Sequence, residues 1–218
     1  MRQLPLQFPT TDLSFDTLAV TDTNRAAVHS LRTVERWPQN TLCLIGAQGS
    51  GLTTLARAWC QQRGATYISL EDTSGQILDP AELEGRDVTL DGADTLCHGE
   101  TLLMLLTAAL RNKTYVLLCA RSAPAQWPLA SADLLSRLKS VPLVQLGPPD
   151  EALFRARLRQ GFERAYLYLS QNVEDYLVSR LGLDYSMLED VIETVAGEAA
   201  NRPVTIPMIR RVLGLSQD

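Results

Sequence analysis

Long apolar runs are missing from this chain of 218 residues. Its longest apolar stretches span about ten residues, whereas a helix that crosses a bilayer needs about 20. The first residues, "MRQLPLQFPTTD", are too few and too polar to resemble a secretory signal peptide. We therefore expect no membrane partner and a cytoplasmic location.

Patterns typical of metal sites are also missing. The four cysteines have neither CxxC spacing nor nearby histidine pairs, and three of them lie in apolar runs. Isolated cysteines in such runs are usually buried, structural thiols in a reduced compartment. We expect this of Cys43, Cys60, Cys97 and Cys119.

The sequence also lacks an excess of positive charge. The chain has 20 Lys and Arg against 25 Asp and Glu, for a net charge of -5. Without an overall basic field, broad non-specific nucleic-acid binding is not expected. The arginines of "FRARLRQGFER" (154–164) form either a local basic patch or, as such runs do more often, a solvated helix face.

Hydrophobic periodicity predicts an α/β fold followed by helices. Short apolar runs alternate with helical patterns as far as Pro148, which is typical of a parallel sheet covered on both faces. We predict a tail, an α/β domain and an all-helical domain, at 1–12, 13–148 and 149–218. The expected strands are 41–46, 65–72, 87–94, 114–122 and 143–149, with helices at 21–37, 52–64 and 101–113.

The stretch "GAQGSGLTT" (46–54) matches a phosphate-binding loop with one residue replaced. The pattern is Gly, four residues, Gly, Lys and then Ser or Thr, and Leu52 occupies the lysine position. An apolar strand precedes the stretch and a helix follows, which is the setting that such a loop needs. The alternative is a purely structural turn. The candidate phosphate-binding residues are Gly46, Gly49, Ser50, Gly51, Thr53 and Thr54.

A strand that ends in an acid, "VTLDGAD", supplies Asp91. In phosphate-loop proteins such an acid holds Mg²⁺ together with the hydroxyl of the loop. Thr53 and Asp91 are therefore the candidate magnesium ligands, for a metal that arrives with a nucleotide. The alternative is that Asp91 only caps the end of the strand.

Together these segments resemble an AAA+ module of the DnaA type. The phosphate loop and the acid-ended strand are followed by "VLLCARS", by "ADLLSRL" and by a helical lid. Within "DLLSRL" (133–138), Arg137 matches the arginine finger of that family. The resemblance implies that Arg137 acts in trans on the nucleotide of a neighbouring module. The alternative is a helix arginine that pairs with a surface carboxylate.

The N-terminal "QLPLQF" (3–8) resembles the peptide by which bacterial proteins dock on the DNA polymerase sliding clamp. In that arrangement Leu6 and Phe8 fill a hydrophobic pocket, Leu4 completes the motif, and Gln3 hydrogen-bonds at the rim. The alternative is an edge strand that covers the core.

A clamp-binding tail on a DnaA-like module is similar to the Hda family, and most of all to its shorter alphaproteobacterial forms. The similarity runs from "SFDTLAV" and Asn24 to "RPVTIPMIRRVL" (202–213). It implies a regulator of replication initiation that binds the clamp and DnaA and stimulates ATP hydrolysis by DnaA. The resemblance also implies no direct sequence-specific DNA binding. Self-association of such modules is an open alternative.

Three departures from that family concern the nucleotide site. Leu52 replaces the lysine, Gly92 replaces a second acid, with Asp94 two residues further on, and Ser186 stands at the position of a lid arginine. We therefore expect weak or absent binding of ADP or ATP with Mg²⁺, and no ATP hydrolysis by the chain itself.

Two other interpretations of the function stay open. The chain is alternatively a degenerate phosphate-loop NTPase or kinase, in which Arg57 or Arg121 replaces the missing lysine. It is alternatively a paralogue that binds DnaA and the clamp without stimulating hydrolysis.

Overall fold

The computed structural model describes residues 14–70, 83, 85–95, 99–129, 131–148, 150–183, 185, 187–199 and 202–214. The chain divides into two compact units, one formed by Leu13–Pro148 and the other containing Pro149–Asp218. The described residues of each unit enclose their own apolar core. The predicted tail, residues 1–12, lies outside the described residues.

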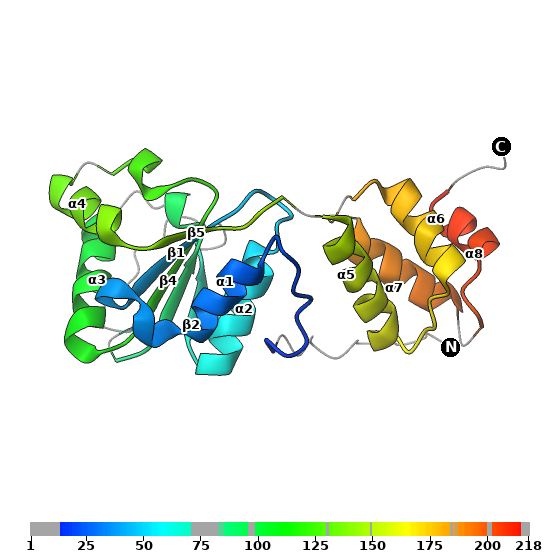
Figure 1. Ribbon diagram of the computed structural model, residues 1–218, viewed down its shortest axis with the longest axis horizontal. Helices are drawn as coiled ribbons and strands as arrows, with labels where there is room; N and C mark the ends of the chain where they lie inside the picture. The colour runs from blue at the N-terminus through cyan, green and yellow to red at the C-terminus, as the bar shows by residue number, and fades with distance from the viewer. Residues whose placement is uncertain are drawn as a thin grey trace, which may run out of the picture. The chain divides into compact units, whose positions relative to one another are not determined.

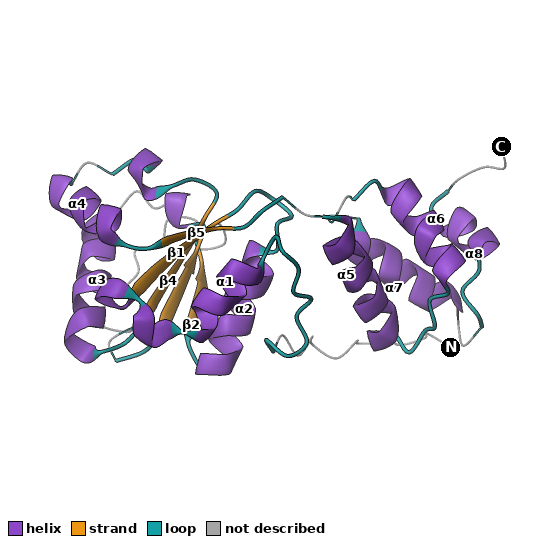
Figure 2. Cartoon of the chain, viewed as in Figure 1, coloured by secondary structure: helices purple, strands orange, loops and turns teal. Residues whose placement is uncertain are grey.

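The described part of the first unit is built on a five-stranded parallel sheet (Figure 2). The order across the sheet is β2-β3-β4-β1-β5, and every pair of neighbours is parallel. β1 and β4 are almost entirely buried, as continuous apolar strands covered on both faces should be. The predicted α/β fold is confirmed. The strands are β1 (Thr41–Ile45), β2 (Thr66–Ser69), β3 (Val88–Asp91), β4 (Val116–Ala120) and β5 (Leu143–Gln145).

Helices cover both faces of the sheet (Figure 1). The helices α1 (Arg25–Arg32) and α2 (Leu52–Arg63) pack on the face to which β1 presents Leu44, and Trp59 is fully buried there. The helices α3 (Gly99–Asn112) and α4 (Ala132–Ser140) pack on the face to which β1 presents Cys43. Because successive side chains of a strand point to opposite faces of the sheet, β1 contributes residues to both apolar cores of this unit.

The first helix is shorter than the predicted range 21–37. It ends at Arg32 and is followed by two 3₁₀ turns, Val34–Arg36 and Pro38–Asn40. Pro38 disfavours helix at the residue before it, and the Trp37 ring instead stacks on Trp59 with centroids 5.4 Å apart. Asn24 directly precedes the helix, but its side chain accepts from the Thr21 N–H and donates to the Ala19 carbonyl rather than capping the helix.

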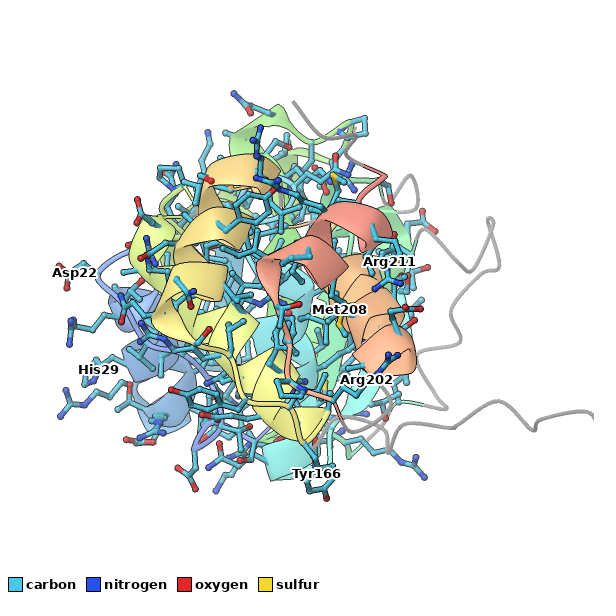
Figure 3. All side chains as sticks on the ribbon, turned by 90° about the vertical axis from the view of Figure 1, so that its right-hand side faces the viewer. Asp22, His29, Tyr166, Arg202, Met208 and Arg211 are labelled. Carbon is cyan, nitrogen blue, oxygen red and sulfur yellow. The ribbon has the colours of Figure 1, made fainter. Side chains whose placement is uncertain are left out.

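The described residues of the second unit form four helices. They are α5 (Glu151–Arg164), α6 (Gln171–Leu181), α7 (Leu188–Ala199) and α8 (Ile206–Val212). Phe154 and Phe162 of α5 are fully buried in their core. Met208 lies between the helices, whereas Tyr166 and Arg211 lie at the periphery (Figure 3).

Three of the four cysteines fall within the described residues, and all three are buried thiols, as predicted. Burial raises the pKa of Cys43 to about 12 and that of Cys119 well above its ordinary value. Cys97 lies outside the described residues.

Within the described residues, no three His, Cys, Asp or Glu side chains gather as metal ligands. No described helix is both long enough and apolar enough to cross a bilayer.

A buried acid joins α5 to α6. Glu174 is 2% exposed and accepts two hydrogen bonds from Arg159, at 2.8 and 2.9 Å. It accepts a third from Arg155 at 3.1 Å, and Arg155 also pairs with Glu151 and Asp175. A buried carboxylate is tolerated because such partners replace its water.

We predict that Glu174→Gln lowers the free energy of unfolding of the helical unit by about 2–3 kcal/mol, since charge-assisted hydrogen bonds inside the protein are lost. Urea unfolding followed by circular dichroism measures the change. Glu151→Gln is the matched control, because Glu151 pairs with the same Arg155 but its side chain is 58% exposed. The control should cost less than about 1 kcal/mol. Equal costs for the two variants would contradict a structural role for the buried acid.

Candidate functional site

The phosphate-loop candidate connects β1 to α2. The Gly46 N–H donates to the Ala120 carbonyl at 3.1 Å, which pairs the start of the loop with the end of β4. Gly49 and Gly51 have φ values of 79° and 89°, in the left-handed region that favours glycine. Gly51 directly precedes α2, and the N–H groups of a first helical turn have no partner within the helix. The backbone thus has the shape that an anion-binding loop requires.

Two hydroxyl side chains lie in or just after the loop besides Thr53. Ser50 is 5% exposed, and its Oγ finds no hydrogen-bond partner in the described part of the chain. A buried hydroxyl without a partner is costly, so one in this loop fits a polar ligand nearby. Thr54 is partly buried in the first turn of α2.

Leu52 occupies the lysine position and is engaged elsewhere. It is the first residue of α2, and its partly buried side chain packs against the core under α1 and α2. The position therefore carries no cation and contributes apolar contact instead.

The structure brings the two candidate magnesium ligands together. Asp91 is the last residue of β3, and the Thr53 Oγ1 donates a hydrogen bond of 2.8 Å to its Oδ2. These two groups, one at the start of α2 and one at the end of β3, are placed where a metal bound to phosphate would lie. Their role as metal ligands stays a prediction.

Tyr67 is the site residue that the sequence did not reveal. From β2 its phenol donates to the same Oδ2 of Asp91 at 2.6 Å. The Arg57 guanidinium lies over the Tyr67 ring, 5.2 Å from its centroid. Burial and then the Asp91 carboxylate raise the pKa of Tyr67 well above its ordinary value, so the phenol remains a donor.

The residues after Asp91 do not supply a second acid. Gly92 has a φ of 82°, and its carbonyl accepts both the N–H and the hydroxyl of Thr95 in a tight turn. Glycine adopts this left-handed conformation at no steric cost, which most other residues would incur. Asp94 accepts from the Arg121 N–H at 3.1 Å and from the Ser122 hydroxyl at 3.3 Å, so it ties this turn to the end of β4.

Arg137 lies on α4 and has partners on α3 and α4. Its side chain is 39% exposed, donates to Thr107 Oγ1 at 3.4 Å and pairs with Asp133 at 3.4 Å. These contacts do not bring it to Thr53 and Asp91. Met104 and Leu110, on either side of Thr107 along α3, are apolar residues that are 52% and 44% exposed.

The remaining candidates cannot be placed. The clamp-binding candidates Gln3, Leu4, Leu6 and Phe8 lie outside the described residues, and so does Ser186.

The residues present fit a nucleotide phosphate in part. The loop backbone, Ser50 and the Thr53–Asp91 pair suit a phosphate with its magnesium. Leu52 supplies no charge, and Tyr67 already donates to the acid. Weak binding of ADP or ATP with Mg²⁺ therefore stays the expectation.

The sheet order, the loop after β1, the acid that ends β3 and the following helices define an AAA+ fold. More particularly, the fold resembles domain III of the Thermotoga maritima replication initiation protein DnaA, with a TM-score of 0.75. That match has 18% sequence identity and covers 94% of this chain and 97% of the other.

Other solved structures extend the likeness. AMPPCP-bound DnaA from Aquifex aeolicus has a TM-score of 0.60 at 15% identity, over 94% of this chain and 88% of that one. A katanin structure titled for self-assembly has a TM-score of 0.56 at 19% identity, over 89% and 74% of the two chains. No family model matches the sequence, and no curated protein matches it. At these identities the likeness establishes the fold alone.

We predict that Leu52→Lys raises the affinity for ADP about tenfold, the effect of one added charge-assisted hydrogen bond to a phosphate. Isothermal titration in EDTA measures it, so that the metal ligands do not contribute. Leu52→Met is the matched control, because it keeps the volume and adds no charge. If both variants bind ADP as the unaltered chain does, the missing cation is not what limits the loop.

Proposed function

We propose that this chain is an adaptor that regulates the initiation of chromosome replication. In this proposal a sliding clamp tethers the module through residues 3–8, and Arg137 enters the nucleotide site of DnaA and stimulates its ATP hydrolysis. In this proposal the chain does not hydrolyse ATP at its own nucleotide site. The likeness to domain III of a DnaA protein supports the choice of DnaA as the partner.

The observation that carries the proposal is a contrast between two sites on one fold. At the nucleotide site, Leu52 supplies no cation and the position after Asp91 is a turn glycine. On α4, Arg137 keeps its charge and is partly exposed. A chain that donates a finger needs the second feature and not the first.

The surroundings of Arg137 support a partner at this surface. Met104 and Leu110, three residues before and after Thr107 on α3, are exposed apolar side chains. Methionine and arginine are enriched in protein interfaces. The hydrogen bond to Thr107 and the pair with Asp133 hold the guanidinium on the surface. Both contacts are long and partly exposed, so an oxygen of a bound phosphate would displace them readily.

We predict that Arg137→Ala returns ATP hydrolysis by DnaA to its unstimulated rate, because an arginine finger contributes about 10³–10⁵ to such rates. Arg137→Lys should restore little, since an ammonium lacks the planar fork of the guanidinium. The measurement is hydrolysis of ATP bound to DnaA with clamp loaded on DNA. Lys139→Ala, which removes an exposed cation from the same helix, is the control and should stimulate normally. Unchanged stimulation by Arg137→Ala would remove the finger role.

We predict that deleting residues 1–9 abolishes binding to the sliding clamp, and that the double substitution Leu6→Ala with Phe8→Ala does the same, because both remove the apolar side chains that fill the pocket. A pull-down with purified clamp measures this. Thr10→Ala is the control within the tail. Retained binding by the truncated chain would rule out the tail assignment.

A catalytic alternative has one observation in its favour: Arg57 reaches Tyr67, the neighbour of Asp91. Turnover by the isolated chain that is lost in Asp91→Ala would support an NTPase or kinase. A paralogue that only binds would pass the clamp pull-down and fail to stimulate DnaA.

A further inference from the structure

The Asp91 carboxylate is held by donors from two different elements. Thr53 Oγ1, from α2, lies 2.8 Å from Oδ2, and the Tyr67 hydroxyl, from β2, lies 2.6 Å from the same oxygen. A carboxylate oxygen that accepts two short hydrogen bonds is already well solvated by the protein. A metal ion at this oxygen would have to displace at least one of the donors.

The position of Tyr67 is built into the sheet. Ser69 is the residue opposite Asp91 in the parallel pair of β2 and β3, and Tyr67 is opposite Thr89. Tyr67 therefore reaches Asp91 along the diagonal of the pair, a distance that a long aromatic side chain can span. Thr89 faces α2, because it accepts a hydrogen bond from Cys60, and the Tyr67 ring packs against the same core.

Arg57 contacts the aromatic ring of Tyr67. It follows Thr53 by one turn of α2, so that the two side chains lie on one face of the helix. Its guanidinium lies 5.2 Å from the centroid of the Tyr67 ring. We call the four residues Thr53, Arg57, Tyr67 and Asp91 the Asp91 cluster.

We propose that Tyr67 competes with magnesium for Asp91: its phenol donates to the carboxylate that would hold the metal of a bound nucleotide, and so favours the metal-free form of the site. This inference concerns the chain's own site and is independent of the role proposed for Arg137. It separates two causes of weak nucleotide binding. Leu52 provides no positive charge for the phosphates, whereas Tyr67 occupies the carboxylate that would otherwise bind the metal.

Tyr67→Phe in the full chain tests the proposal, because it removes the hydroxyl and leaves the ring that Arg57 contacts. The probe is ADP, titrated calorimetrically with and without Mg²⁺ and followed in parallel by thermal unfolding. We expect magnesium to tighten ADP binding at least about tenfold more in Tyr67→Phe than in the unaltered chain, which is the loss of one hydrogen bond to a charged group. Adding Thr53→Val to Tyr67→Phe should abolish the gain.

Tyr115→Phe is the matched control. Tyr115 packs on the same core and has an arginine over its ring, Arg63 at 4.9 Å, but its hydroxyl is not bonded to Asp91. Its response to Mg²⁺ should equal that of the unaltered chain. The proposal is overturned if Tyr67→Phe responds to Mg²⁺ no more than the unaltered chain, including the case in which neither responds. It is also overturned if the gain persists with Thr53→Val or appears in Tyr115→Phe.

Discussion

The parallel register of β1, β4 and β3 is the constraint on which the candidate site depends. Ile45 pairs with Ala120, and Asp91 pairs with Cys119, so the three strands end at nearly the same level. The loop after β1, the acid that ends β3 and the turn at Gly92 therefore meet at one edge of the sheet. The hydrogen bond between Thr53 and Asp91 is a consequence of this register, since neither residue is near the other in sequence.

At that edge of the sheet, apolar contacts and neutral hydrogen-bond donors occupy positions where working phosphate-loop proteins have charged side chains. Leu52 makes an apolar contact at the lysine position, and the position after the acid is a turn whose conformation favours glycine. The acid is satisfied by two hydroxyl groups within the Asp91 cluster. The charge on which the proposed function depends lies elsewhere, at Arg137.

Much of this arrangement was predictable from local sequence. The apolar runs gave the strands, Gly64 marked the end of α2, and loop spacing with an acid-ended strand predicted the Thr53–Asp91 pair. Tyr67 was missed because its contact depends on the register of β2 with β3, which no local pattern encodes. The bonds of Glu174 to Arg155 and Arg159 were missed for a similar reason: they join two helices whose packing is set by the whole core.

The central claim is that this chain acts on the nucleotide of a partner and does not need its own. Asp91→Asn tests it most directly, because an amide still accepts from Thr53 and Tyr67 but is a poor ligand for magnesium. The measurement is one round of hydrolysis of labelled ATP bound to DnaA, with clamp loaded on DNA. We predict that Asp91→Asn stimulates hydrolysis as the unaltered chain does. Loss of stimulation in this variant, with its fold and clamp binding intact, would contradict the claim.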